Sequence, residues 1–299
     1  MIYLPYLLML ISISFTTLNG TFLHKFSNRD LNNSGDIYLF NGAISLVWSV
    51  ILFFLAIFTD GINFNLTTFI FGLIYAIILC AYQLFKCLAL SNGPISLTTL
   101  IANCAFLITT GYAFFIEKEK ISLLQLIGII FLLAALFLCL NPRAKNTGNN
   151  MKITARWLIF AALLFLSGGG VGIIYRLFGK SDVSQNATSM LLFAALISAA
   201  LFIILAFCSN LASKKPIPKL SKTALKYALL CGATGCIYIR MNLSLSAIIP
   251  PVIFFPASNG LTVILSSIVG WILFKEKLPA KQICGILIGL LAIILIGCF

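Results

Sequence analysis

The chain contains the residues Lys118-Glu119-Lys120-Ile121-Ser122-Leu123-Leu124-Gln125-Leu126-Ile127-Gly128-Ile129 and repeats them, with changes, as Lys275-Glu276-Lys277-Leu278-Pro279-Ala280-Lys281-Gln282-Ile283-Cys284-Gly285-Ile286. Lys, Glu, Lys, Gln, Gly and Ile occupy matching places, and a long apolar run lies on either side of each copy. The same offset of 157 residues, from 118 to 275, also matches Pro94 with Pro251. The sequence therefore predicts an internal duplication.

The composition is that of a polytopic membrane protein. Of the 299 residues, 61% are hydrophobic and only 9% are charged, which is too little polar surface to cover a soluble domain. A helix needs about 20 mainly apolar residues to cross a hydrocarbon core of roughly 30 Å, and it satisfies its own backbone hydrogen bonds there. Ten such runs occur, so the predicted fold class is an all-α membrane protein with ten transmembrane helices.

The ten predicted helices form two sets of five. The predicted ranges are 2–23, 37–58, 68–90, 95–115, 123–140, 157–178, 187–208, 224–248, 253–274 and 282–298. We divide the chain into a first repeat, a basic linker loop and a second repeat, at residues 1–141, 142–156 and 157–299. Because five is odd, the second repeat enters the bilayer with the opposite orientation, which predicts two inverted five-helix repeats.

The first apolar run resembles a signal peptide in position only. It lacks a basic start and a small-x-small cleavage site, so we expect it to stay in the protein as a helix.

The basic residues are placed as in a membrane protein rather than as in a nucleic-acid-binding protein. The formal net charge is +13, and the cations gather in short loops, above all those after the fifth and seventh predicted helices. Positive loops stay in the cytoplasm, which predicts that both termini lie outside. We expect the lipid bilayer and a small-molecule substrate as partners, and no nucleic acid; the oligomeric state stays open.

The sequence contains no pattern typical of an active site. The only histidine is His24, and the nine cysteines are scattered without Cys-x-x-Cys spacing, so they indicate neither zinc nor a disulfide framework. The glycine-rich run 167–172 lies inside an apolar span and lacks the Gly-Lys-Ser/Thr ending of a phosphate loop. We therefore expect no enzymatic activity, no bound metal ion and no cofactor.

Several of these features together resemble a known family. Ten helices in two repeats, the turn Asn92-Gly93-Pro94-Ile95-Ser96, and the helix–Glu–Gln–Ile/Leu–Gly–helix ending of each half at 119–128 and 276–285 resemble the EamA branch of the drug/metabolite transporter superfamily. The resemblance implies a secondary transporter that works by alternating access, often an exporter of amino acids or other small metabolites. We expect an integral, multi-pass protein of a bacterial inner membrane or a plasma membrane. Members of one fold family take unlike substrates, so the resemblance names no particular one.

Apart from Arg176 and Lys226, which lie at the ends of spans, two cations lie inside predicted spans, whereas none of the seven acidic residues does. Lys86 lies in the third helix and Arg240 in the eighth, which is the equivalent helix of the second repeat, and the repeat offset matches Arg240 with Gln83. A charge at bilayer depth costs roughly 2.5 to 3.5 kcal/mol and usually faces a cavity or a partner. Snorkelling of the long side chains to the headgroups is the alternative. The lack of a mid-span carboxylate argues against a carboxylate-coupled exporter of lipophilic cations.

We predict a substrate site that combines the two cations with neutral hydrogen-bonding groups. Tyr82 lies one turn from Lys86 on the same helical face, and Asn103 and Asn259 belong to polar rows of the fourth and ninth helices. Hydrogen bonding between helices is the alternative role of such rows. The predicted substrate-binding residues are Lys86, Arg240, Tyr82, Gln83, Asn103, Asn259 and Asn242.

The sequence thus favours a carrier of a small polar or anionic metabolite, with amino-acid export as the leading hypothesis. A lipophilic drug or lipid exporter is the alternative within transport, and a non-transporting membrane scaffold or receptor is the alternative of another class.

Overall fold

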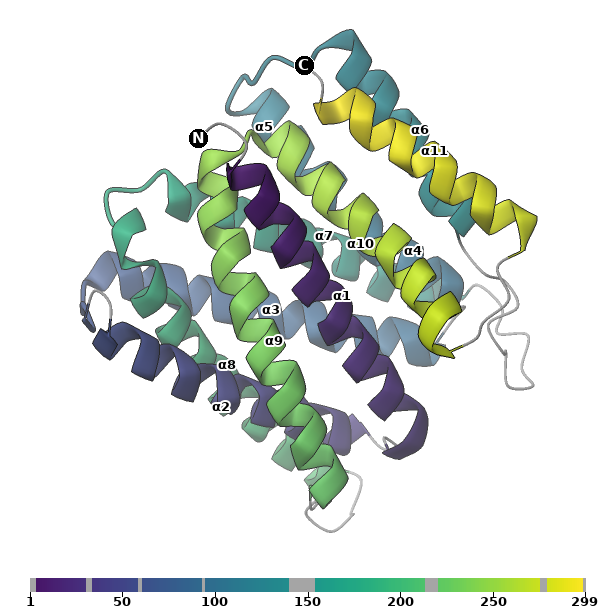
Figure 1. Cartoon of the computed structure of the whole chain (residues 1–299). Helices are drawn as coiled ribbons and strands as arrows, with labels where there is room; N and C mark the ends of the chain where they lie inside the picture. Colours follow the sequence, from purple (N-terminus) through teal and green to yellow (C-terminus); the bar gives the residue numbers. More distant parts are fainter. Residues whose placement is uncertain are drawn as a thin grey trace. The chain divides into compact units, whose positions relative to one another are not determined.

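The structure, a computed structural model, describes residues 4–30, 34–58, 61–92, 95–139, 154–212, 220–274 and 279–297. The regular elements within these ranges are all helices (Figure 1). They are α1 (Leu4–Asp30), α2 (Ser34–Phe58), α3 (Leu66–Asn92), α4 (Ile95–Cys104), α5 (Phe106–Phe115), α6 (Leu123–Cys139), α7 (Ala155–Gly179), the short 3₁₀ helix η1 (Ser184–Asn186), α8 (Ala187–Ala212), α9 (Lys222–Ile248), α10 (Pro251–Phe274) and α11 (Ala280–Gly297).

The predicted all-α membrane fold is confirmed. In the described ranges, nine stretches are long and apolar enough to cross a membrane, counting α4 and α5 as one. The remaining predicted span, the fifth in chain order, corresponds to α6, an apolar helix of 17 residues, which is about the shortest length that spans a bilayer. The first helix continues to Asp30, past its predicted end at Leu23, because polar residues extend a helix beyond its apolar run.

The fourth predicted helix is interrupted at Ala105, which separates α4 from α5. The amide of Ile108 donates to the carbonyl of Ala105 at 3.1 Å, a tighter i to i+3 turn than the α-helix makes. Helix α7 approaches at this point, since a Cβ placed on Gly168 would lie 2.8 Å from the Cβ of Ala105. The interruption has neither a proline nor a glycine at its centre, which is why the hydropathy pattern missed it.

The chain forms two compact units. Unit 1 comprises 1–80 and 177–244, and unit 2 comprises 81–176 and 245–299. Each unit therefore combines segments of both predicted repeats, and α3, α7 and α9 contribute to both units.

In unit 1, the principal pair is α2 with α8, the second helices of the two repeats (Figure 1). A Cβ on Gly35, near the start of α2, would meet Asn210 near the end of α8, and one on Gly42 would meet Phe202. Contacts that move backward along α8 as they move forward along α2 mean that the two helices run antiparallel.

In unit 2, α6 lies against α11, the fifth helices of the repeats (Figure 1). A Cβ on Gly128 would lie 2.7 Å from Cγ1 of Ile296, and one on Gly285 would lie 2.9 Å from Sγ of Cys139. Gly128 matches Gly285, and Cys139 matches Ile296, at the offset of the sequence repeat. The two contacts are therefore copies of each other about a pseudo-twofold axis. Their order makes the helices antiparallel, as inverted repeats require.

The glutamines of the repeated stretch complete hydrogen bonds at the two ends of α6. Gln125 accepts from the amide of Ser122 at 3.0 Å, and the Ser122 hydroxyl accepts from the amide of Gln125 at 3.2 Å, which is a reciprocal N-terminal cap. Gln282 Nε2 donates at 3.0 Å to the carbonyl of Cys139, the last residue of α6. The duplicated glutamines therefore bind the ends of α6, and the duplicated glycines allow α6 and α11 to pack closely.

We expect Gly128→Ala and Gly285→Ala each to lower the melting temperature in detergent. Each new Cβ meets backbone or buried side-chain atoms at 3.0 Å or less, and overpacking typically costs about 1 to 3 kcal/mol. The matched control is Gly111→Ala, because nothing lies within 4 Å of that Cβ and alanine is the better helix former. Equal melting temperatures for all three variants would show that the crossing of α6 and α11 is not close-packed.

Candidate functional site

Arg240 lies within the membrane span formed by α9, about two turns before the end of the helix. In unit 1 its Nε donates to Thr188 Oγ1 at 3.3 Å, and its Nη1 donates to Ser244 Oγ. Thr188 is buried at the start of α8, and Ser244 lies one turn further along α9. Both of these acceptors are neutral hydroxyls.

Asn242, another predicted substrate-binding residue, takes part in a contact between helices. Its Oδ1 accepts from the hydroxyl of Ser12 in α1 at 2.7 Å. Further along the same pair of helices, Asn19 Nδ2 donates to the carbonyl of Cys231 at 2.6 Å and to Thr234 Oγ1 at 3.1 Å. These bonds join α1 to α9, which is the alternative role that polar side chains have in membrane helices.

Three predicted site residues lie on the part of α3 that belongs to unit 2. Lys86 Nζ lies 5.8 Å from the ring centroid of Tyr82, one turn back, within reach of a cation–π contact. The Tyr82 ring in turn lies against Gly168 of α7, where a Cβ would approach it to 3.3 Å. Gln83 is half-buried beside them. The structure therefore brings Tyr82 and Lys86 together.

The two predicted asparagines of unit 2 donate to their own helices. Asn103 Nδ2 donates to the carbonyl of Thr99 at 2.9 Å, and Asn259 Nδ2 donates to the carbonyl of Phe255 at 2.9 Å. Bonds to the preceding turn are a local arrangement that polar side chains adopt in helices. A role of either amide in substrate binding stays a prediction.

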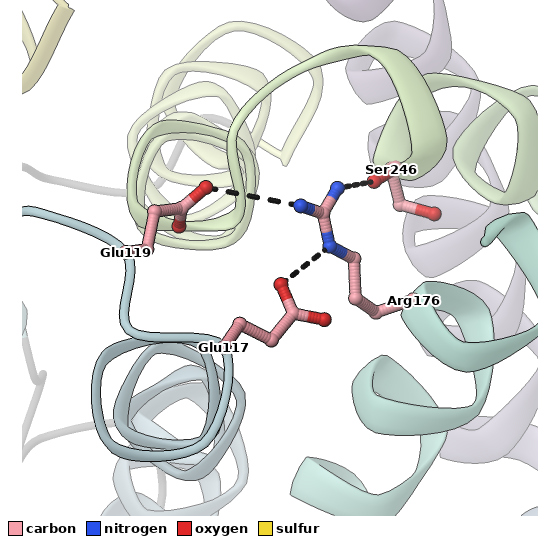
Figure 2. Close-up of polar contacts among 4 residues, drawn as sticks. All are labelled: Glu117, Glu119, Arg176 and Ser246. Atoms are coloured by element: carbon pink, nitrogen blue, oxygen red, sulfur yellow. Dashed lines mark hydrogen bonds and ion pairs between the residues drawn. The ribbon is translucent and has the colours of Figure 1, made fainter.

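A cluster centred on Arg176 was not predicted from the sequence (Figure 2). Arg176 Nε donates to Glu117 Oε2 at 2.9 Å, and Nη1 donates to the carbonyl of Ser246 at 3.1 Å. Nη2 lies 3.8 Å from Glu119 Oε1. The Arg176 and Glu117 side chains are 11% and 8% exposed. All four residues belong to unit 2, so this is a largely buried ion-pair cluster.

Helix C-termini account for the position of Arg176. It lies in the last turn of α7, Ser246 lies in the last turn of α9, and the two glutamates follow the end of α5. The C-terminus of a helix carries partial negative charge on its unpaired carbonyls. Because the guanidinium presents several donors in one plane, a single arginine binds two carboxylates and one such carbonyl.

The backbone between the glutamates is held in an unusual conformation. Lys118 has φ of 53°, in the left-handed region that costs about 1 to 2 kcal/mol for a residue with a Cβ. The amide of Glu117 donates to the carbonyl of Tyr112 at 3.4 Å, and that of Glu119 donates to Ala113 at 3.0 Å. This turn ends α5 and presents the carboxylates on both sides of Lys118 to the same arginine.

The sequence held a signal for this cluster. Residues 117–120 carry two acidic and two basic side chains between the fourth and fifth predicted helices, and Arg176 lies at the end of the sixth. The predicted topology, however, puts the ends of the fourth, sixth and eighth helices on one side of the membrane. Opposite charges at the ends of the fourth and sixth helices were therefore candidates for an ion pair.

We expect Arg176→Gln to destabilise the folded protein strongly. Removing one partner of a buried ion pair typically costs about 3 to 5 kcal/mol, because the other charge stays buried. Thermal unfolding in detergent measures the loss, with Lys120→Gln, an exposed charge on the same turn, as the control. Adding Glu117→Gln to Arg176→Gln should recover part of the loss. A melting temperature equal to that of the control would mean that the cluster contributes nothing to stability.

Comparisons with known proteins confirm the predicted family resemblance over the first repeat. The model of the EamA-like transporter family, part of the drug/metabolite transporter superfamily, matches residues 4–141. No curated protein matches the chain. A solved structure titled "Crystal structure of protein" is similar, with 13% identity and a TM-score of 0.76 over 98% of this chain and 96% of that chain. At this identity the likeness shows a shared fold alone.

Proposed function

Because residues 4–141 belong to the EamA-like transporter family, which indicates a transporter of the drug/metabolite type, we propose that this protein carries a small polar or anionic metabolite across the membrane. An amino acid is the leading substrate and export the leading direction. The mechanism that we propose is alternating access, in a bacterial inner membrane or a plasma membrane.

The observation that carries the proposal is the setting of Arg240. A guanidinium inside a span costs roughly 2.5 to 3.5 kcal/mol on insertion scales. Two of the acceptors that hold it are the neutral hydroxyls of Thr188 and Ser244. Because the local dielectric constant is low, a substrate carboxylate or phosphate gains more from this charge than it would in water. Arg240 therefore serves as the anion-binding residue of the carrier.

The remaining predicted residues have supporting roles in this proposal. Lys86 supplies a second positive charge, and neutral groups orient the substrate through hydrogen bonds. These neutral groups belong to Tyr82, Gln83, Asn103, Asn259 and Asn242.

The antiparallel pairs support the proposed mechanism. Secondary transporters with inverted repeats bind substrate near the midplane and expose it alternately to the two sides. The contact of Gly128 with Ile296 and the contact of Gly285 with Cys139 join matching positions of the two repeats. The interface between the two fifth helices is therefore symmetric when the repeats are exchanged.

We expect carboxylate compounds to raise the melting temperature of the detergent-purified protein. A ligand at one hundred times its dissociation constant stabilises the folded state by about 2.7 kcal/mol. The screen contains amino acids, organic acids, sugar phosphates and cationic dyes. Arg240→Gln should abolish the shift, whereas Arg156→Gln, the same change at an exposed position, should keep it.

Two results would contradict the anion site. A shift with cationic dyes alone, unchanged in Arg240→Gln, would favour the exporter of lipophilic drugs or lipids. The absence of a shift with every class of compound, in a protein that melts cooperatively, would favour a scaffold or receptor.

A further inference from the structure

Helix α5 is a short, separate helix within unit 2. Its ten residues are divided from α4 by the tight turn at Ala105, which makes no side-chain cap for α5. A stretch of i to i+3 bonding in the middle of a membrane span is a common place for a hinge. Ala105 is therefore the point at which this span bends most readily.

The start of α5 rests on three glycines of α7. Glycines leave no side-chain ridge into which the facing helix could interlock, so α5 can tilt on this face without a steric barrier. The hydroxyl of Thr109 donates to the carbonyl of Gly169 at 3.1 Å and ties the two helices together. The pairs that a glycine Cβ would bring into contact are Gly168 with Ala105, Gly169 with Ile108 and Gly172 with Thr109.

The other end of α5 is fastened by the Arg176 cluster (Figure 2). The turn that follows α5 carries Glu117 and Glu119, and Arg176 contacts both carboxylates. Glu117 Oε2 lies 2.9 Å from the guanidinium and its side chain is 8% exposed, whereas Glu119 Oε1 lies 3.8 Å away and its side chain is 23% exposed. Ion pairs that are partly exposed contribute little to stability. The fastening is therefore tight at one carboxylate and loose at the other.

The helix beside α5 also has a point at which it can bend. Helix α10, the equivalent helix of the second repeat, packs against α5, and Pro256 lies inside it. Proline lacks the amide that would bond to the preceding turn, so helices bend at such a residue. Phe255 lies on the same face of α7 as α5, since a Cβ on Gly172 would come within 3.0 Å of its ring. Helix α10 can therefore follow a movement of α5.

We propose that α5 is a gate of the carrier, an arm that swings about Ala105 and that Arg176 latches in the position seen in this structure. When the guanidinium releases Glu119 and then Glu117, the turn after α5 is freed and α5 tilts on the glycine face of α7. The inference rests on the proposed function, because a gate acts only in a protein that exposes its substrate alternately to the two sides.

The test uses Thr110→Cys as a reporter of the position of α5. The Thr110 side chain is 5% exposed, and its hydroxyl has no hydrogen-bond partner among the residues that the structure describes, so cysteine replaces it with little loss. A hydrophilic thiosulfonate modifies a thiol that water reaches, and peptide mass spectrometry measures the rate at each position. Cys139, which is buried between α6 and α11, is the internal control because that contact takes no part in the motion.

We expect Glu119→Gln to raise the rate at the reporter thiol about twofold to fivefold, the factor that a partly exposed ion pair supplies. Lys120→Gln, an exposed charge on the same turn, should leave this rate unchanged, and the rate at Cys139 should be the same in every variant. The amino acid that raises the melting temperature most should change the reporter rate at least twofold, because substrate shifts the population of gate positions.

A reporter rate that Glu119→Gln leaves unchanged would overturn the latch. Rates that rise equally at the reporter and at Cys139 would mean a general loosening of the fold and would contradict the gate. A reporter rate that does not respond to an amino acid that stabilises the same protein would overturn the gate and leave the carrier standing. If no compound stabilises the protein, the gate fails together with the proposed function, even where Glu119→Gln frees α5.

Discussion

The close approach of α6 and α11 is the interaction on which the inverted architecture depends. Lipid gives apolar helices no hydrophobic reason to associate, so association depends on close packing and on hydrogen bonds between helices. Gly128 and Gly285 let each backbone reach the other, and Gln282 ties the helices together at the last carbonyl of α6. The stretch that the sequence repeats therefore builds one of the contacts between the repeats, within unit 2.

Two arginines in the helical region have different partners and, in this account, different tasks. Arg176 binds Glu117 at 2.9 Å and is largely buried, so its charge is cancelled and its role is to hold helix ends together. Arg240 donates to the hydroxyls of Thr188 and Ser244, and we propose that it binds the anionic group of a substrate.

The helices could be predicted from the sequence because hydropathy is a local property. The matching Lys, Glu, Gln and Gly residues, which are also local, predict the duplication. The break at Ala105 did not, because the turn is tight where Gly168 of a distant helix approaches. The Arg176 cluster and the bond of Ser12 to Asn242 also join residues far apart in sequence, so periodicity could not reveal them. For the candidate site, the sequence selected Arg240, while its partners Thr188 and Ser244 required the fold.

Counterflow tests the central claim, that Arg240 binds the anion of a substrate carried by alternating access, most directly. Liposomes containing the protein are loaded with the unlabelled amino acid that raises the melting temperature most in the thermal-shift screen, and are placed in a trace of the same amino acid in labelled form, with no ion gradient. A carrier should accumulate label transiently above equilibrium. The overshoot should persist in Arg156→Gln and vanish in Arg240→Gln. Equilibration without an overshoot in the wild-type protein, or the same overshoot in Arg240→Gln, would contradict this account.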